Sequence, residues 1–248
     1  MKGSIHSIET MGLLDGPGIR TVVFLQGCPL RCQYCHNPDS QRVNGGKEMD
    51  SEEILEIVKR FKPYFKRSKG GVTISGGEPL IQGDFLIELL QKIQGEGICT
   101  VVDTSGFGDK SKYDEILKYT DLVLLDLKHY DPKEHMKLVK RPMNLQEDFI
   151  ESLIKNNTRL WIRHVMVPGW TDNEESMRRL AERILPLYDR VEKIEILPYM
   201  TFGEGKYKEL GLEYELEGVD PMKKSRAKEL EEYLIDYLEE QMNIKRVV

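Results

Sequence analysis

Short apolar runs rich in β-branched residues alternate along this chain with longer segments whose apolar residues recur every three or four positions. The first pattern is typical of buried strands and the second of helices that pack on a sheet. We expect strands over residues 21–26, 72–75, 98–102, 122–125, 159–165 and 191–197. We expect helices over 50–65, 84–94, 111–119, one or two over 132–156, one from Asp172 and a last one from Asp220.

Strands that alternate with helices form a parallel sheet with right-handed crossovers. Six such units fall short of the roughly eight that close a barrel. We therefore expect an α/β fold with an open, partial (β/α)6 TIM-like barrel and outer helices, and a doubly wound open sheet is the alternative. All 248 residues should form a single domain, with residues 1–20 as an irregular, glycine-rich extension, a core over 15–240 and a short end strand over 244–248.

The composition narrows the class of protein. Hydrophobic residues make up 40% and charged residues 31%, as in ordinary globular proteins, and the net charge of −6 argues against bulk attraction to nucleic acid. No apolar run approaches the roughly 20 residues that span a bilayer, and the first residues lack the apolar core of a secretory signal. Three of the four cysteines are bunched, which is no disulfide framework, so we expect a reducing, cytoplasmic setting.

The bunched cysteines, Cys28, Cys32 and Cys35, lie in a loop directly after the first predicted strand. A closed zinc site needs about four protein ligands, and a four-iron cluster held wholly by cysteine needs about four thiolates. Three cysteines leave one position for a group that is not protein, or they form a Cys3His zinc site with His36. The spacing alone leaves both open. Cys99 lies in a predicted strand among apolar neighbours, so we expect it to be a buried, small hydrophobic residue.

Other unusual polar groups follow the ends of the next predicted strands, the edge at which parallel sheets bind ligands. Because residues two apart on a strand share a face, Asp126 and Lys128 should point the same way. The residues at these strand ends are Gly76, Gly77, Glu78, Asp103, Thr104, Asp126, Lys128 and Arg163.

Each of these groups also has a purely structural explanation. The two glycines could form a tight turn, either aspartate could cap the next helix, and Lys128 could be a solvated rim charge. Arg163 could pair with a carboxylate at the edge of the core. The strand positions do not decide between the two explanations.

The C-x3-C-x2-C loop, with Tyr34 beside its last cysteine, resembles the radical S-adenosylmethionine (SAM) enzymes. In that family three cysteines hold a four-iron, four-sulfur cluster, and the ligand SAM chelates the fourth iron. The stretch from Gly76 to Pro79 resembles the family's motif for the amino group of SAM. More closely, the chain resembles the pyruvate formate-lyase-activating enzymes, in stretches that run through most of its length: 5–9, 15–20, 26–28, 34–37, 45–48, 75–78, 103–104, 125–128, 161–163, 167–170 and 196–199.

The resemblance implies an oxidoreductase of anaerobic glucose metabolism that cleaves SAM reductively to methionine and a 5′-deoxyadenosyl radical. The radical would remove the Cα hydrogen of one glycine of pyruvate formate-lyase and leave a stable glycyl radical there. Reduced flavodoxin or ferredoxin would be the electron donor. We expect a monomer with no nucleic-acid or membrane partner.

The resemblance also assigns residues. Cys28, Cys32 and Cys35 would hold the cluster, and the contacts to SAM would be Tyr34, His36, Gly77, Asp126, Leu127, Lys128 and Met200. Asp103, Thr104 and Asp126 would hold a monovalent cation, while Asp15, His36 and Arg163 would face the partner's glycine loop. Met200 departs from the family pattern, because members carry a histidine there and a thioether cannot donate a hydrogen bond.

Two other functions fit parts of the sequence. The chain could activate a different glycyl-radical enzyme, although many such activators carry a ferredoxin-like insertion with extra cysteines and this chain has only Cys99 to spare. From another class, a zinc-binding interaction module without catalysis would also use the cysteine loop.

Overall fold

The described chain, residues 1–242 of a computed structural model, forms two compact units. The end strand expected over 244–248 lies outside the described residues. The first unit comprises residues 1–30, 39–126 and 143–160, and the second comprises 31–38, 127–142 and the described chain from 161 onward.

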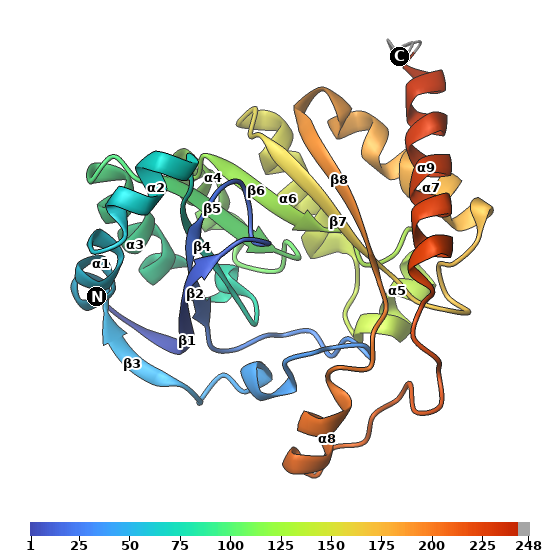
Figure 1. The fold of residues 1–248 in the computed structure, drawn as a ribbon, viewed down its shortest axis with the longest axis horizontal. Helices are drawn as coiled ribbons and strands as arrows, with labels where there is room; N and C mark the ends of the chain where they lie inside the picture. The colour runs from blue at the N-terminus through green and yellow to red at the C-terminus, as the bar shows by residue number, and fades with distance from the viewer. Residues whose placement is uncertain (243–248) are drawn as a thin grey trace. The chain divides into compact units, whose positions relative to one another are not determined.

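The first unit is built on strands in the order β3-β1-β2-β4-β5-β6 (Figure 1). Strands β2, β4, β5 and β6 are parallel, as predicted, and β1 runs antiparallel to both β2 and β3. The strands are β1 (Lys2–Gly12), β2 (Arg20–Leu25), β3 (Lys47–Asp50), β4 (Gly71–Gly76), β5 (Cys99–Thr104) and β6 (Leu122–Asp126).

Helices α1, α3, α4 and α6 of this unit pack against one another in succession. Their apolar stripes cover buried strand residues such as Val23, Ile74 and Val102, which are fully excluded from solvent. The helical elements are α1 (Ser51–Lys59), α2 (Lys62–Ser68), η2 (Pro79–Gln82), α3 (Gly83–Gly95), α4 (Lys110–Lys118) and α6 (Asn144–Lys155).

The helix expected over 50–65 begins as predicted and then breaks. The Asp50 side chain accepts from Glu52 N, while Glu53 accepts from Asp50 N at 2.7 Å, which completes a capping box. The single-helix prediction is wrong past Lys59, because Pro63 has no N–H to continue the ladder and instead occupies the first turn of α2.

The second unit contains two neighbouring strands and a set of helices (Figure 1). Its elements are α5 (Pro132–Val139), β7 (Leu160–Met166), α7 (Glu174–Ile184), η3 (Leu185–Arg190), β8 (Val191–Pro198), α8 (Glu204–Leu210) and α9 (Lys224–Gln241). The short η1 (Pro38–Gln41), which follows the cysteine loop, lies mostly in the first unit. Helix α9 packs on α7 and β8 through buried leucines, including Leu230, Leu234 and Leu238.

Two predictions about chain ends are wrong. Residues 2–12 are not irregular: they form β1, because Ile5 is buried between two partner strands and the glycines at 12, 16 and 18 come only at or after its end. The last helix begins at Lys224 and not at Asp220, because Met222 N donates to Tyr199 O at 2.9 Å and holds the preceding residues out of the helix.

The sequence patterns also did not predict β3 or α8, and the predicted start of α7 was one residue early. Asn173, not Asp172, caps α7 by accepting from Ser176 N at 2.9 Å. The Asp172 carboxylate instead closes a turn by accepting from Gly169 N at 2.8 Å. No helix in residues 1–242 is both long and apolar enough to cross a membrane.

Candidate functional site

The carboxyl ends of β4, β5 and β6 lie beside one another in the first unit. Ile74 is paired with Val102, and Thr104 is paired with Leu125. Gly77, Asp103 and Asp126 therefore stand at one edge of the sheet, as the sequence predicted.

The start of the cysteine loop is fixed to the glycine-rich loop by backbone bonds. Gly27 N donates to Ser40 O at 2.7 Å, and Glu78 N donates to Gly27 O at 2.8 Å. A Cβ at position 77 would lie 2.1 Å from Gly27 O, so only glycine permits this approach. The glycine pair is thus more than a turn: it lets one loop pack directly on the loop that carries Cys28.

Glu78 organises this edge, although sequence reasoning did not include it among the site residues. Its buried carboxyl accepts from Thr104 Oγ1, from Ser105 N at 2.8 Å and from Leu80 N at 3.2 Å. Burial raises the pKa of Glu78 to about 7, against the opposing effect of these hydrogen bonds. The Gly-Gly-Glu motif at a strand end was the available signal, but nothing in the sequence shows that the carboxyl is buried.

The residues predicted to bind a monovalent cation have hydrogen-bond partners within the first unit. The Asp103 carboxylate accepts from Ser75 Oγ at 2.9 Å, and the Thr104 hydroxyl, which donates to Glu78, also accepts from Gly106 N at 2.9 Å. The hydroxyl of Thr104 therefore belongs to the Glu78 network. The backbone oxygen of Asp126 accepts from Gln146 Nε2 at 3.0 Å.

The prediction that Asp126 and Lys128 share a strand face is wrong, because it assumed that both residues lie on the strand. Strand β6 ends at Asp126, so strand alternation does not reach Lys128. Beyond the strand, Leu127 N donates to Arg163 O at 2.8 Å and Leu127 O accepts from His164 Nδ1 at 2.7 Å. Both backbone groups of Leu127 are thus bonded within the second unit.

The rest of the cysteine loop, residues 31–38, belongs to the second unit. Arg31 N donates to Val139 O at 2.9 Å, and Gln33 N donates to Leu138 O at 3.0 Å, which ties the segment to the end of α5. Cys35 N donates to Cys32 O at 3.1 Å, so these two cysteines share one turn.

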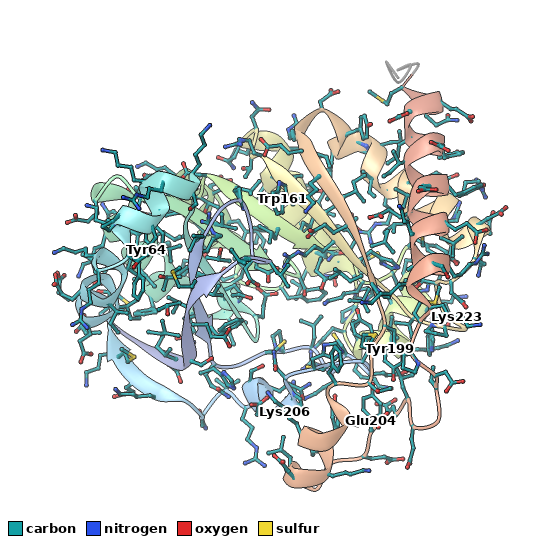
Figure 2. All side chains as sticks on the ribbon, in the orientation of Figure 1. Tyr64, Trp161, Tyr199, Glu204, Lys206 and Lys223 are labelled. Atoms are coloured by element: carbon teal, nitrogen blue, oxygen red, sulfur yellow. The ribbon has the colours of Figure 1, made fainter. Side chains whose placement is uncertain are left out.

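His36 and Met200 are neighbours in the second unit, as two predicted contacts of one ligand should be. His36 Nε2 donates to Met200 O at 3.0 Å, and its ring meets Phe202 edge-on at 5.9 Å. Lys206 of α8, labelled in Figure 2, donates to Asn37 Oδ1 at 2.9 Å and holds the same segment.

Two cationic side chains that were predicted at the site, Lys128 and Arg163, have specific contacts in the second unit. Lys128 is only 8% exposed, and its Nζ lies 5.5 Å from the centroid of the Tyr34 ring, so it is not a solvated rim charge. Arg163 Nε donates to Glu195 Oε2 at 2.9 Å, which supplies the carboxylate partner that the structural explanation expected.

The two units divide the predicted residues between them. Within residues 1–242, no three His, Cys, Asp or Glu side chains stand together as a ready metal site. The fit to an iron–sulfur cluster rests on donor chemistry: none of the four cysteines forms a disulfide, and three of them fall within eight residues. The first unit holds Asp15, Cys28, Gly77, Asp103, Thr104 and Asp126, and the second holds Cys32, Tyr34, Cys35, His36, Leu127, Lys128, Arg163 and Met200.

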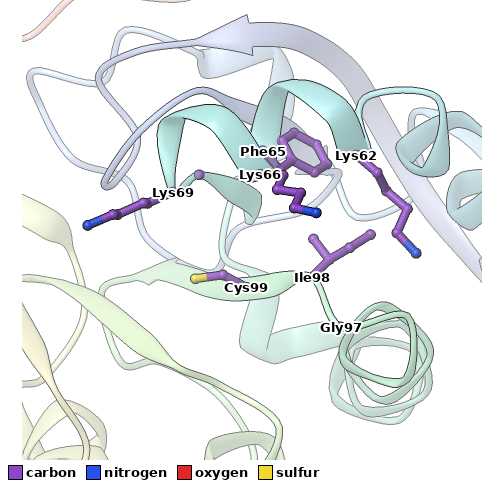
Figure 3. Close-up of a pocket in the computed structure, with 8 residues that line it drawn as sticks. Lys62, Phe65, Lys66, Lys69, Gly97, Ile98 and Cys99 are labelled. Atoms are coloured by element: carbon purple, nitrogen blue, oxygen red, sulfur yellow. The ribbon is translucent and has the colours of Figure 1, made fainter.

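A pocket of about 540 Å³ lies at the other end of β4 and β5, where these strands begin (Figure 3). No predicted site residue lines it. Cys99 is half-buried in its wall, so the prediction of a buried hydrophobic residue is only partly right. The lining residues are Lys62, Phe65, Lys66, Lys69, Gly70, Gly97, Ile98 and Cys99.

Comparison with known proteins shows the family of this chain. Residues 22–181 match the family model described as the radical SAM superfamily. The chain is 52% identical to a pyruvate formate-lyase-activating enzyme of Clostridium pasteurianum, over 96% of this chain and 99% of the relative. It is 44% identical to the Staphylococcus epidermidis enzyme of the same name, over 94% and 96%.

Among solved structures, Streptococcus suis SuiB bound to its precursor peptide SuiA matches with a TM-score of 0.66 at 20% identity, over 93% of this chain and 48% of that one. That likeness confirms the α/β fold with an open, mostly parallel sheet and outer helices. The chain belongs to the radical SAM superfamily and, within it, to the pyruvate formate-lyase-activating enzymes.

Proposed function

We propose that the glycyl-radical enzyme activated by this chain is pyruvate formate-lyase. Membership of the superfamily supplies the cofactors, a four-iron, four-sulfur cluster and SAM. When bound, they provide a 5′-deoxyadenosyl radical that removes the Cα hydrogen of a glycine in the partner enzyme. The observation that carries the proposal is the 52% identity, over 96% of this chain, to the Clostridium pasteurianum enzyme named for activating pyruvate formate-lyase.

We propose that Cys28, Cys32 and Cys35 hold three irons of the cluster. None of the three forms a disulfide, and each would bind as the thiolate. The fourth iron is left without a protein ligand, which suits chelation by an amino acid group. His36 lies beside Met200, another proposed contact, and is itself proposed as a contact and not as a fourth metal ligand.

The contacts to SAM are proposed from the residues that the family resemblance assigns. Gly77 lets its loop pack directly on Gly27, which fixes the main chain that would meet the ligand's amino group. The shielded ammonium of Lys128 suits an anionic ligand group, and Tyr34 beside it offers an apolar face. Asp126 and Leu127 complete this set, while Met200 beside His36 would contact the adenosine end.

A monovalent cation is proposed at Asp103, Thr104 and Asp126. A cluster, a ligand carboxylate and two aspartates concentrate negative charge, and a bound cation would offset it. The hydrogen bond from Ser75 already orients Asp103.

The partner's glycine loop is proposed to meet Asp15, His36 and Arg163. The ion pair with Glu195 fixes the guanidinium of Arg163, and the burial of Glu195, which raises its pKa, is outweighed by Lys193 and Arg163 so that the pKa is lowered. A fixed cation orients a polypeptide better than a mobile one.

We further propose reduced flavodoxin or ferredoxin as the electron donor, and a monomeric, cytoplasmic enzyme in which residues 1–248 act as one radical SAM domain. Four cysteines without a disulfide support a reducing compartment.

The test is anaerobic incubation of the reconstituted chain with SAM, a reductant and pyruvate formate-lyase, followed by EPR. We expect a glycyl radical on the partner, and none on a partner whose radical-site glycine is changed to alanine. Reductive cleavage of SAM without a radical on pyruvate formate-lyase, but with one on another glycyl-radical enzyme, would assign the chain to that other partner.

A further inference from the structure

The guanidinium of Arg20, at the start of β2, is fully buried in the first unit. Arg20 Nε donates to Thr73 Oγ1 at 2.6 Å, Nη1 donates to Pro17 O at 3.0 Å, and Nη2 donates to Val72 O at 2.6 Å and to Cys99 O at 3.2 Å. These acceptors are all neutral oxygens. A buried cation is unfavourable unless it is fully bonded, and here it is spread over three segments of chain.

One of those segments is the loop that carries Asp15. Thr73, which accepts from Arg20, also donates its hydroxyl hydrogen to Asp15 O at 2.5 Å. Gly16 has φ +121°, and a Cβ there would lie 3.1 Å from Arg20 Cδ. The loop therefore wraps the arginine stem, and three successive residues of it, from 15 to 17, are fixed by Arg20 and Thr73.

The same loop exposes large apolar side chains just before Asp15. Leu13 is 69% exposed and Leu14 is 80% exposed, although both sit next to a rigidly held segment. Adjacent exposed leucines are typical of a surface that contacts another protein. Fixing such a loop in advance lowers the ordering entropy lost when a partner binds.

We infer that Arg20 and Thr73 are positioning residues that hold Asp15 ready for the partner's glycine loop. The inference rests on the proposed function, in which Asp15 faces that loop. Neither residue touches the reacting atoms. Their role is to keep the backbone of residues 15–17 in one conformation, so their loss should weaken productive binding of the protein substrate and leave SAM chemistry intact.

The test compares Thr73→Val, which has nearly the same shape but no hydroxyl, with Thr73→Ser, which keeps it. We expect Thr73→Val to raise KM for pyruvate formate-lyase roughly tenfold, because two buried hydrogen bonds are lost. The Kd for SAM and the rate of SAM cleavage without partner should not change. Thr73→Ser should restore a KM close to that of the unaltered enzyme.

A double-mutant cycle separates positioning from general stability. In an Asp15→Ala background, Thr73→Val should raise KM no further, because the group that it positions is gone. Independent, additive effects would overturn the inference, as would an unchanged KM in Thr73→Val alone. Arg20→Lys, which keeps the charge but cannot reach all four oxygens, provides a second cycle if Thr73→Val does not fold. If the unaltered enzyme itself yields no glycyl radical, the proposed function fails first and the cycle is run against the true partner.

Discussion

The two units fix their predicted site residues in position by different kinds of contact. The first uses backbone: Gly27 and Glu78 are joined main chain to main chain, and Gly77 is needed because no side chain fits. The second adds side-chain bonds to its backbone bonds, as from His36 to Met200 O and from Lys206 to Asn37. Ligand binding by residues of the first unit should therefore be lost when atoms are added to the backbone. Binding by residues of the second unit should be lost when side-chain groups are removed or exchanged.

The largest expected effect is loss of the cluster when a side-chain ligand is removed. Cys28→Ala, Cys32→Ala and Cys35→Ala should each abolish reductive cleavage of SAM, because each thiolate would bind one iron. The check is iron content, about four per chain in the unaltered enzyme, together with assay of 5′-deoxyadenosine. Cys99→Ala is the matched control and should keep both, and loss of iron in that variant would refute the three-cysteine assignment.

The second prediction concerns one methyl group added to the glycine-rich loop of the first unit. Gly77→Ala should weaken SAM binding by roughly a hundredfold or more, because its Cβ would lie 2.1 Å from Gly27 O and the two loops must separate. Equilibrium dialysis with labelled SAM measures the change. Gly95→Ala is the control, since a Cβ at that helix end meets nothing within 4 Å. Equal affinities in the two variants would mean that the loop contact is irrelevant to binding.

The third prediction concerns pH and the buried carboxyl of the first unit. Burial raises the pKa of Glu78 from 4.5 to about 7, so between these values the unfolded chain loses a proton that the folded chain retains. The stability contributed by this group is therefore complete below 4.5 and falls as pH rises toward 7, by at most about 1.4 kcal/mol per pH unit.

The measurement is the free energy of unfolding by urea across that pH range. Glu78→Gln should remove this part of the pH dependence, even though it loses the bond from Ser105 N and is less stable overall. Glu115→Gln, at an exposed position of α4, should leave the pH profile as it is. A profile unchanged in Glu78→Gln would show that this carboxyl does not titrate in that interval.

The smallest expected effect exchanges one side chain in the second unit. Met200→His would place a hydrogen-bond donor where family members carry one, and SAM should bind roughly threefold more tightly. Calorimetric titration with SAM is sensitive enough to detect the change. Met136→His, on the exposed face of α5, is the control. If the two variants bind SAM equally, Met200 does not contact the ligand.

Local patterns predicted the first unit well because its determinants are local. The apolar runs at β4, β5 and β6 located the edge that carries Gly77, Asp103 and Asp126, and the capping box from Asp50 to Glu53 lies within one helical turn. The same reasoning could not find that Glu78 is buried, since burial depends on how the loop after β5 folds over it. Nor could it find β1, whose pairing with β3 joins segments far apart in the chain.

The second unit was predicted less well because its contacts are distant in sequence. His36 and Met200 are 164 residues apart, and no local pattern joins them. The start of α9 was misplaced for a similar reason, because a bond from Met222 to Tyr199 overrides the cap-like Asp220-Pro221 pair. The site residues predicted in this unit come from the family resemblance and not from periodicity.

Segment 31–38 contacts residues that come much later in the sequence, and this affects how the protein folds during synthesis on the ribosome. Its partners include Leu138, Met200 and Glu215, so they emerge long after Cys32 and Cys35. At about 5–20 residues per second, roughly 10–35 s pass before the last of them is made. Most of the first unit can fold in that interval while these two thiols still lack their neighbours. Cluster insertion is therefore expected to follow completion of the chain, and oxidants should damage the nascent protein more readily than the finished one.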